Sequence, residues 1–134
     1  MEFALSEEQV LLQDTLSRML EDQCQLDQVR AVLAEGPAQD DELWRALVTM
    51  GLTGLMIPEE YGGLGMTLLD AALVQEQLGR HVAPVAFASS VVMAPVALLG
   101  AASEAQKQAW LPQIAEGSLQ VAMAISEHSG RRES

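Results

Sequence analysis

The sequence predicts an all-α fold, a bundle of five to six helices with short connections. Three observations support this prediction. Helix-start patterns recur along the chain, apolar residues recur at helical rather than alternating spacing, and no pair of strand-like segments is present. A length of 134 residues, 49% of them hydrophobic, is that of one domain with enough apolar side chains for a core.

The first helix is predicted to begin after Ser6, because Ser6 and Gln9 form a capping box with acidic residues in the turn that follows. Apolar residues continue at helical spacing to about Leu33, and Gly36-Pro37 ends the pattern. One uninterrupted helix is therefore expected over this range.

A second helix is predicted from Asp40 or Asp41 to Gly51. The connection after it, residues 51–65, reads G-L-T-G-L-M-I-P-E-E-Y-G-G-L-G and alternates turn residues with side chains that favour burial. Glycine permits left-handed backbone or close approach, and Pro58 fixes its own φ. We therefore expect an ordered, packed connection.

Three more helices follow. Thr67 and Asp70 form a capping box for a helix that ends near Gly79. The helix over 84–99 is apolar all round, so it is expected to be buried on all sides, with a kink at Pro95. A last helix is predicted after Ser103, interrupted at Pro112 and closed near Gly117, and 120–126 has the composition of a short incipient strand.

Composition argues against several functions. A net charge of −12 with a single lysine disfavours nucleic acid and anionic membranes as partners. No apolar run reaches the length of a membrane span, and the N-terminus lacks a basic signal region, so a cytoplasmic protein is expected. Cys24 is the only cysteine, and His81 and His128 lie far apart, so no metal site is predicted.

Four segments in order resemble the acyl-CoA dehydrogenase family. The connection over 51–65 is similar to the family's G-L-x-G-L-x-x-P-E-x-Y-G-G-x-G. Residues 76–79 resemble V-x-E-E-L-G-R, and 104–117 resemble S-E-E-Q-K-x-x-x-L-P-x-L-A-x-G. Residues 122–127 look like the start of A-x-A-x-T-E-P-x-x-G-S-D, but His128 replaces the proline and Gly-Arg-Arg stands where G-S-D should come.

The resemblance implies that residues 1–119 are the family's N-terminal helical domain. Residues 120–134 then correspond to the start of a truncated middle β-domain and a mobile tail. Complete family members use FAD to remove the α and β hydrogens of an acyl-CoA thioester; a glutamate takes the α-proton and flavin N5 the β-hydrogen. That glutamate and most FAD-binding residues lie outside the part of the family that this sequence matches. No catalytic residue is assigned, and the chain alone is not expected to be catalytic.

Residue by residue, the resemblance implies flavin contacts at three positions, namely Met123, Ile125 and Ser126. It implies an acyl-chain wall at four others, namely Phe87, Ser90, Val91 and Ala94. Helix packing alone also accounts for the small and apolar residues of 84–99. The expected partners are acyl-CoA in the complete protein and a homo- or hetero-oligomer through exposed apolar helix faces. The alternative is a non-catalytic helical module that pairs with a separately encoded subunit.

Overall fold

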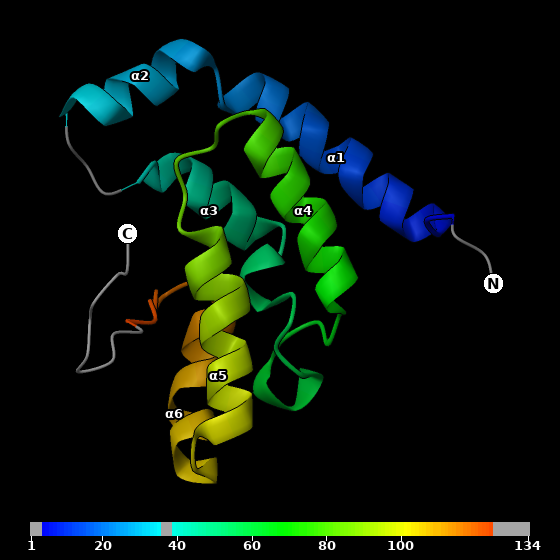
Figure 1. Ribbon diagram of the computed structural model, residues 1–134, viewed down its shortest axis with the longest axis vertical. Coiled ribbons are helices and arrows are strands. Elements are labelled where there is room, and N and C mark those ends of the chain that lie inside the picture. Colours follow the sequence, from blue (N-terminus) through cyan, green and yellow to red (C-terminus); the bar gives the residue numbers. More distant parts are fainter. Residues whose placement is uncertain (1–3, 36–38, 125–134) are drawn as a thin grey trace, which may run out of the picture.

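The computed structural model describes residues 4–35 and 39–124, and within these ranges it is an all-α bundle without a strand (Figure 1). The α-helices are α1 Glu7–Gln23, α2 Leu26–Glu35, α3 Asp41–Thr49, α4 Leu68–Arg80, α5 Ala94–Ala101 and α6 Glu104–Ala115. Three short turns complete the order: the 3₁₀ turns η1 Leu52–Gly54 and η2 Glu59–Tyr61, and the π-helix η3 Ala88–Met93. The predicted fold class is confirmed.

The helix starts are those that the cap patterns predict. In each reciprocal capping box the N-cap hydroxyl accepts the backbone N–H three residues on, and that residue's side chain accepts the N-cap N–H. These pairs are Ser6 with Gln9, Thr67 with Asp70, and Ser103 with Gln106. Such caps are visible in a sequence because both partners lie within four residues of each other.

The prediction of one uninterrupted first helix is wrong, because the helix ends at Cys24 and a second helix follows. Its backbone leaves the helical region, and its thiol donates a hydrogen bond to the carbonyl of His81 at 3.5 Å. The backbone N–H of Gln25 then donates to the side-chain oxygen Oε1 of Gln28 at 3.0 Å, which caps the start of α2. No glycine or proline marks the break, so the local sequence gives no sign of it. Beyond the break α2 extends away from the bundle (Figure 1) and buries Val29.

The later helices also depart from the expectation in two places. Met93 and Val96 are 43% and 53% exposed, so the helix over 84–99 is not buried on all sides. A π turn precedes Pro95, which stands at the start of α5 and has no N–H to donate. Pro112 does not interrupt α6, which continues to Ala115.

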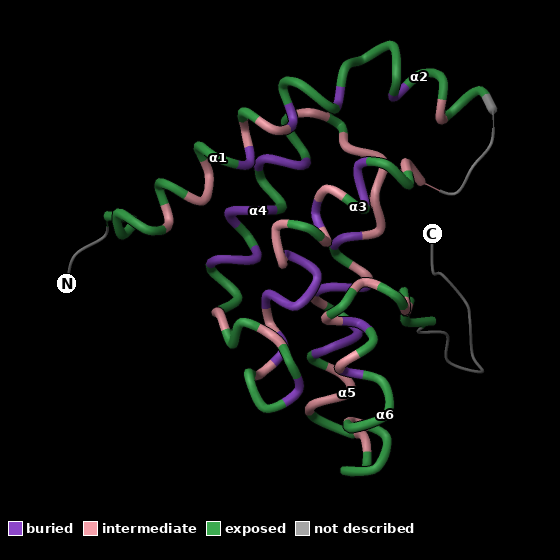
Figure 2. Tube along the Cα trace, turned by 180° about the vertical axis from the view of Figure 1, so that it is seen from behind, coloured by how far each residue is buried: buried purple, intermediate pink, exposed green. Residues whose placement is uncertain are grey.

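Two hydrophobic cores hold these elements together, and their buried segments gather where the helices meet (Figure 2). The larger joins α1, α3, the glycine-rich connection, α4 and η3; its side chains include Leu16, Leu20, Leu47, Leu55, Val74, Phe87 and Val91. The smaller joins the connection to α6 through Ile57, Tyr61, Leu111 and Ile114. The connection belongs to both cores and therefore links the two halves of the bundle.

The connection is ordered and packed, as predicted. Its backbone closes on itself through bonds from Leu64 N to Gly54 O and from Met66 N to Leu55 O, at 2.9 and 2.8 Å. A Cβ on Gly63 would lie 2.0 Å from the carbonyl oxygen of Ile57, so glycine is required by close approach. The fold therefore accounts for this glycine without a ligand.

The incipient strand is not formed over residues 120–124, which have no regular secondary structure. A strand needs a neighbour to accept its backbone hydrogen bonds, and the described chain offers none. Ile125 and Ser126 lie outside the described residues. In 4–35 and 39–124, no helix combines the length and the apolarity needed to cross a membrane.

Candidate functional site

One stretch of the chain, which forms η3 and α5, carries no charge. Residues 82–103 contain no Asp, Glu, Lys or Arg, and they form the loop before η3, then η3 and α5. The inner side of η3 buries Phe87 and Val91, whereas Met93 and Val96 face outward. This stretch is therefore attached to the core on one side and presents apolar side chains on the other.

An apolar hollow of about 190 Å³ lies between α4 and η3, which we call the α4–η3 hollow. Its lining residues are Leu68, Ala71, Ala72, Gln75, Ala88, Val92 and Met93. Ligand sites usually enclose about 300–1,000 Å³ and cover most of their ligand. The α4–η3 hollow is smaller and open, so it has the character of one wall of a site that another surface completes.

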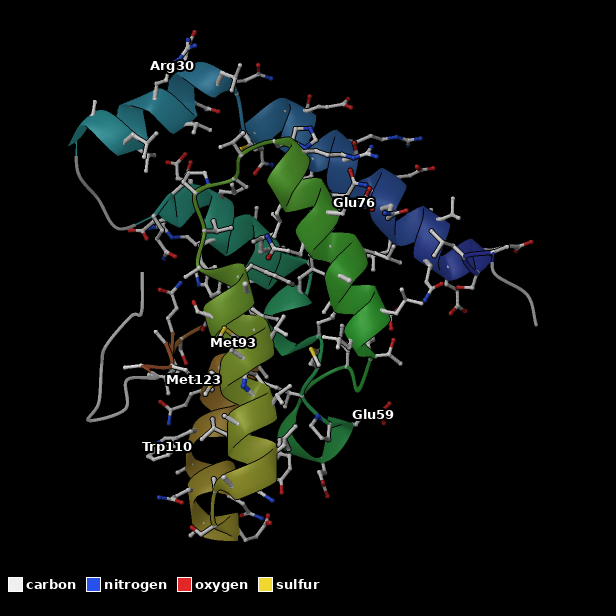
Figure 3. The ribbon with its side chains drawn as sticks, viewed as in Figure 1. Arg30, Glu59, Glu76, Met93, Trp110 and Met123 are labelled. Carbon is white, nitrogen blue, oxygen red and sulfur yellow. The ribbon has the colours of Figure 1, made fainter. Side chains whose placement is uncertain are left out.

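A second apolar hollow, of about 260 Å³, lies between α5, α6 and the segment that leaves the bundle. We call it the α5–α6 hollow; its lining residues are Leu98, Trp110, Leu119 and Val121. Figure 3 shows Met93, Trp110 and Met123 on this same side of the molecule. Trp110 and Met123 are 41% and 39% exposed, which extends the open apolar surface.

The segment over 119–124, the exit segment, is attached to the bundle by polar as well as apolar contacts. The amide of Val121 donates to the buried hydroxyl oxygen of Ser90 at 3.1 Å. The side-chain amides of Gln39 and Gln120 donate to each other at 3.1 and 3.0 Å. Residues from three distant parts of the sequence thus define where the chain leaves the bundle.

The structure places the predicted acyl-wall residues in the interior. Their exposed fractions are at most 1%, for Phe87, Ser90, Val91 and Ala94 alike. The residues of the same helix that line the α4–η3 hollow are instead Ala88, Val92 and Met93. Sequence reasoning missed these three because an all-apolar helix offers no polar contrast from which to assign its faces. The assignment of the four buried residues to an acyl wall stays a prediction.

Of the three predicted flavin contacts, only Met123 lies within the described residues, where it is partly exposed beside the α5–α6 hollow. The surroundings there are apolar and uncharged. They fit the dimethylbenzene edge of a flavin ring, which is flat and apolar. They do not fit the diphosphate of FAD, because no cation or glycine-rich phosphate loop accompanies them.

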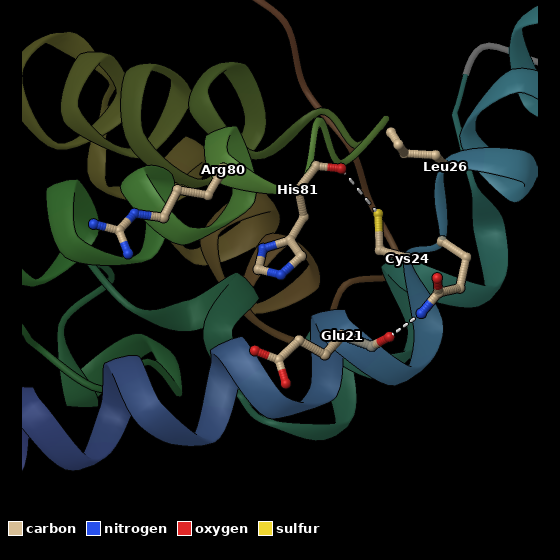
Figure 4. Close-up of a pocket in the computed structure, with 6 residues that line it drawn as sticks. Glu21, Cys24, Leu26, Arg80 and His81 are labelled. Carbon is tan, nitrogen blue, oxygen red and sulfur yellow. Dashed lines mark hydrogen bonds between the residues drawn. The ribbon is translucent and has the colours of Figure 1, made fainter.

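A larger hollow, of about 360 Å³, lies away from this surface, where the α1–α2 break meets the end of α4 (Figure 4). It is lined by Glu21, Cys24, Gln25, Leu26, Arg80 and His81. Burial, with a smaller contribution from Asp40, raises the pKa of the Cys24 thiol, which makes it a poor nucleophile. Among the described residues, no three metal-ligating side chains gather here or elsewhere.

A hydrogen bond attaches the glycine-rich connection to the start of α6. The Tyr61 hydroxyl donates to Glu104 Oε1 at 2.7 Å. This bond, more than burial, raises the pKa of Tyr61 to about 12, and it lowers the pKa of Glu104. The acid pair Glu59 and Glu60 is exposed, so its surroundings do not set it apart as a base.

Comparison with known proteins agrees with this architecture. Residues 6–118 match the sequence model of the acyl-CoA dehydrogenase N-terminal domain. The chain belongs to the acyl-CoA dehydrogenase family. Over 113 residues it is 38% identical to the acyl-CoA dehydrogenase IpdE2 of Mycobacterium tuberculosis, covering 84% of this chain and 35% of that protein. The chain thus spans about a third of the length of such a relative.

Solved acyl-CoA dehydrogenase structures share the fold. The ChsE4-ChsE5 complex from Mycobacterium tuberculosis matches with a TM-score of 0.85 and 28% identity, covering 98% of this chain and 36% of that chain. A variant of the Tcur3481-Tcur3483 steroid ACAD matches with a TM-score of 0.80 and 32% identity, covering 92% and 34%. The helical bundle therefore corresponds to one part of a larger fold in these proteins.

Proposed function

We propose that this chain serves as the N-terminal helical domain of an FAD-dependent acyl-CoA dehydrogenase and that the apolar surface around η3 and α5 covers the flavin and acyl site. Residues 1–119 form that domain, and 120–134 begin the middle β-domain. The observation that carries the proposal is the open apolar side, with two hollows, next to the exit segment. A surface of this kind is typical of an interface that remains to be covered.

Within that site, the chain supplies apolar surface rather than reacting groups. The α4–η3 hollow forms part of the wall for the acyl chain, through the exposed faces of Val92 and Met93. The buried residues Phe87, Val91 and Ala94 support this wall from beneath. Met123 lies against the edge of the flavin, with Ile125 and Ser126 following it in the sequence. FAD, when bound, supplies the acceptor for the β-hydrogen of the thioester.

The proton chemistry and most of the cofactor contacts come from polypeptide beyond the matched domain. The described residues bring no carboxylate to the lining of the α4–η3 hollow, where Gln75 is the only polar side chain. They also carry no cation that lines the α5–α6 hollow. The partner of this chain is therefore the remainder of the dehydrogenase, in the same polypeptide or in a second subunit.

The test co-expresses the chain with a polypeptide that supplies the middle β-domain and the C-terminal helical domain of the family. It then measures the flavin-to-protein ratio and acyl-CoA-dependent dye reduction. Met93→Glu places a charge in the α4–η3 hollow and is expected to reduce turnover at least tenfold, because a desolvated carboxylate opposes an apolar ligand. Leu11→Glu, 67% exposed on α1, is the matched control and is expected to change neither quantity.

Equal turnover in Met93→Glu and wild type would contradict the placement of the acyl chain. Absence of bound flavin in every complex would contradict the oxidoreductase role altogether. If the chain still co-purified stoichiometrically with a second subunit in that case, the result would favour the alternative, a non-catalytic helical module.

A further inference from the structure

Two adjacent serines in η3 have different hydrogen-bond partners. Ser89 is half-buried, and its hydroxyl donates at 3.2 Å to the carbonyl of Ala86, which lies just before the helix. Ser90 is 1% exposed, and its hydroxyl oxygen accepts the amide of Val121 at 3.1 Å, 31 residues later in the sequence. The first bond is local to the helix, whereas the second fixes a distant piece of backbone.

Ser90 lies inside the π turn η3. At its end, the amide of Ala94 donates to the carbonyl of Ser89, five residues earlier rather than four. Such a turn holds one extra residue, which rotates the side chains before it relative to those after it by about 100°. Within this turn Ser90 faces the exit segment, whereas Val92 and Met93 face the α4–η3 hollow. Single π turns are rare and are often found at functional sites.

The bond from the Val121 amide to the Ser90 hydroxyl is a part-buried polar attachment of the exit segment. The reciprocal Gln39–Gln120 pair is exposed, so water competes for both of its bonds. Leu119 and Val121 pack against the smaller core, which limits sideways movement but does not fix the rotation of the backbone. A hydrogen bond to the Val121 amide is directional and does fix it.

We infer that Ser90 is a positioning residue: its hydroxyl, through the hydrogen bond that it accepts from the Val121 amide, sets the backbone orientation with which residues 121–124 reach the flavin. This inference rests on the proposed function, and it assigns Ser90 a different role from that of an acyl-wall residue. Met123 follows Val121 by two residues, so a rotation at Val121 carries directly to the side chain beside the α5–α6 hollow.

The first test uses the ¹⁵N-labelled 134-residue chain and measures amide hydrogen exchange at Val121. Ser90→Ala is expected to speed exchange at Val121 by about tenfold, with the amides of α4 and α6 unchanged. Ser90→Thr keeps the hydroxyl and is expected to restore protection. Ser89→Ala, the matched control, is expected to leave Val121 as in wild type. Unchanged exchange in Ser90→Ala, or loss of protection throughout η3, would overturn the inference.

The second test uses the flavin-loaded complex described above. Ser90→Ala is expected to shift the visible flavin absorbance, and Ser90→Thr to return it to the wild-type position. An unshifted spectrum, with faster Val121 exchange, would overturn the link to the flavin. Failure of every complex to bind flavin would instead contradict the proposed function, while the amide measurement would still decide whether Ser90 orients the exit segment.

Discussion

The α1–α4 side and the η3–α5–α6 side of the bundle differ in the kinds of side chain that they expose. On the first, Asp70 accepts a hydrogen bond from Gln9 across the two helices at 2.8 Å, and Gln13 donates to Glu76 at 3.3 Å. On the second, no charged residue occurs from 82 to 103, and apolar side chains stay open to solvent. Val10 and Leu11 are also exposed on α1, at 45% and 67%, so the two sides differ in charge rather than in the presence of exposed apolar side chains.

The difference shows which of the two surfaces already has its polar groups paired within the chain and which one is open to a partner. Across α1 and α4, polar groups from both helices satisfy one another, and solvent meets charged side chains outside them. Around η3, the two hollows are lined by apolar side chains, with Gln75 as the one polar exception, and remain open to a complementary surface. Stability is therefore expected to depend on the inner residues of both sides, and binding on the outer residues of the second.

The sharpest test of this distinction compares two residues on opposite faces of one helix. Phe87→Ala removes a ring that is 1% exposed in the larger core and is expected to lower the free energy of unfolding by about 3–5 kcal/mol. Met93→Ala, at a residue 43% exposed, is expected to change it by less than about 0.5 kcal/mol. Urea denaturation followed by circular dichroism measures both. Equal losses would mean that the outer face is as integral to the fold as the inner one.

The closed side is tested at Asp70. Asp70→Ala leaves the Gln9 side chain and the Thr67 cap without their acceptor, and it is expected to cost about 1–3 kcal/mol of unfolding free energy. Glu76→Ala, the control on the same helix, removes exposed contacts and is expected to cost less than about 0.5 kcal/mol. A small loss at Asp70 would show that apolar packing alone joins α1 to α4.

The pH dependence of that contribution has a definite sign. Burial opposes ionisation of Asp70, but hydrogen bonds from Thr67 and Gln9 outweigh it and hold its pKa below the ordinary 3.8. The stabilisation is thus fully present above 3.8 and is lost as the pH falls through the lower pKa of the folded protein. The difference in unfolding free energy between wild type and Asp70→Ala should be constant from pH 7 to 5 and decrease in stronger acid. A difference that grows in acid would reverse the assignment.

A smaller effect is expected at Val82, where the chain passes from the closed side to the open one. Val82 is β-branched, 59% exposed and held at a φ of 53° after the end of α4. Left-handed backbone of this kind is costly for such a residue and easy for glycine. Val82→Gly is expected to raise the unfolding free energy by about 0.5–1 kcal/mol after the entropy cost of glycine. A loss of stability would indicate that the Val82 side chain makes a contact that outweighs the strain.

The smallest effect concerns the hydrogen bond between Tyr61 of the connection and Glu104 of α6, and it is measured by spectroscopy. Tyr61 is the only tyrosine, so its ionisation is seen in isolation in ultraviolet absorbance. The midpoint is expected near its raised pKa of about 12, because the hydroxyl donates to Glu104. Glu104→Gln should bring the midpoint back toward the ordinary value of 10.0. A midpoint near 10.0 in wild type would show that the bond is not maintained in solution.

Local sequence patterns predicted the helix starts and the connection well. The capping boxes at Ser6, Thr67 and Ser103 act within four residues, so the sequence alone contains both partners. The glycines of 51–65 mark left-handed or close-packed backbone, which is again a local requirement. The resemblance to acyl-CoA dehydrogenases, which such local segments carry, was confirmed by the match of residues 6–118 to the family's N-terminal domain.

Features that depend on distant contacts were missed. The helix break at Cys24 is stabilised by the hydrogen bond from its thiol to the carbonyl of His81, and no helix-breaking residue near Cys24 indicates it in the sequence. The orientation of the helix around Ser90 was also hidden, since apolar residues on every face leave its two sides indistinguishable. Four predicted wall residues therefore lie inside the core, and the residues that line the hollow alternate with them.

What the sequence by itself determined was the fold class, the family and the helix boundaries set by caps and glycines, because each depends on residues close together in the chain. Tertiary structure decided the rest: where the first helix breaks, which face of the apolar helix stays open, and how Ser90 comes to hold Val121. These features depend on which distant surfaces meet, and that is settled only when the two cores pack.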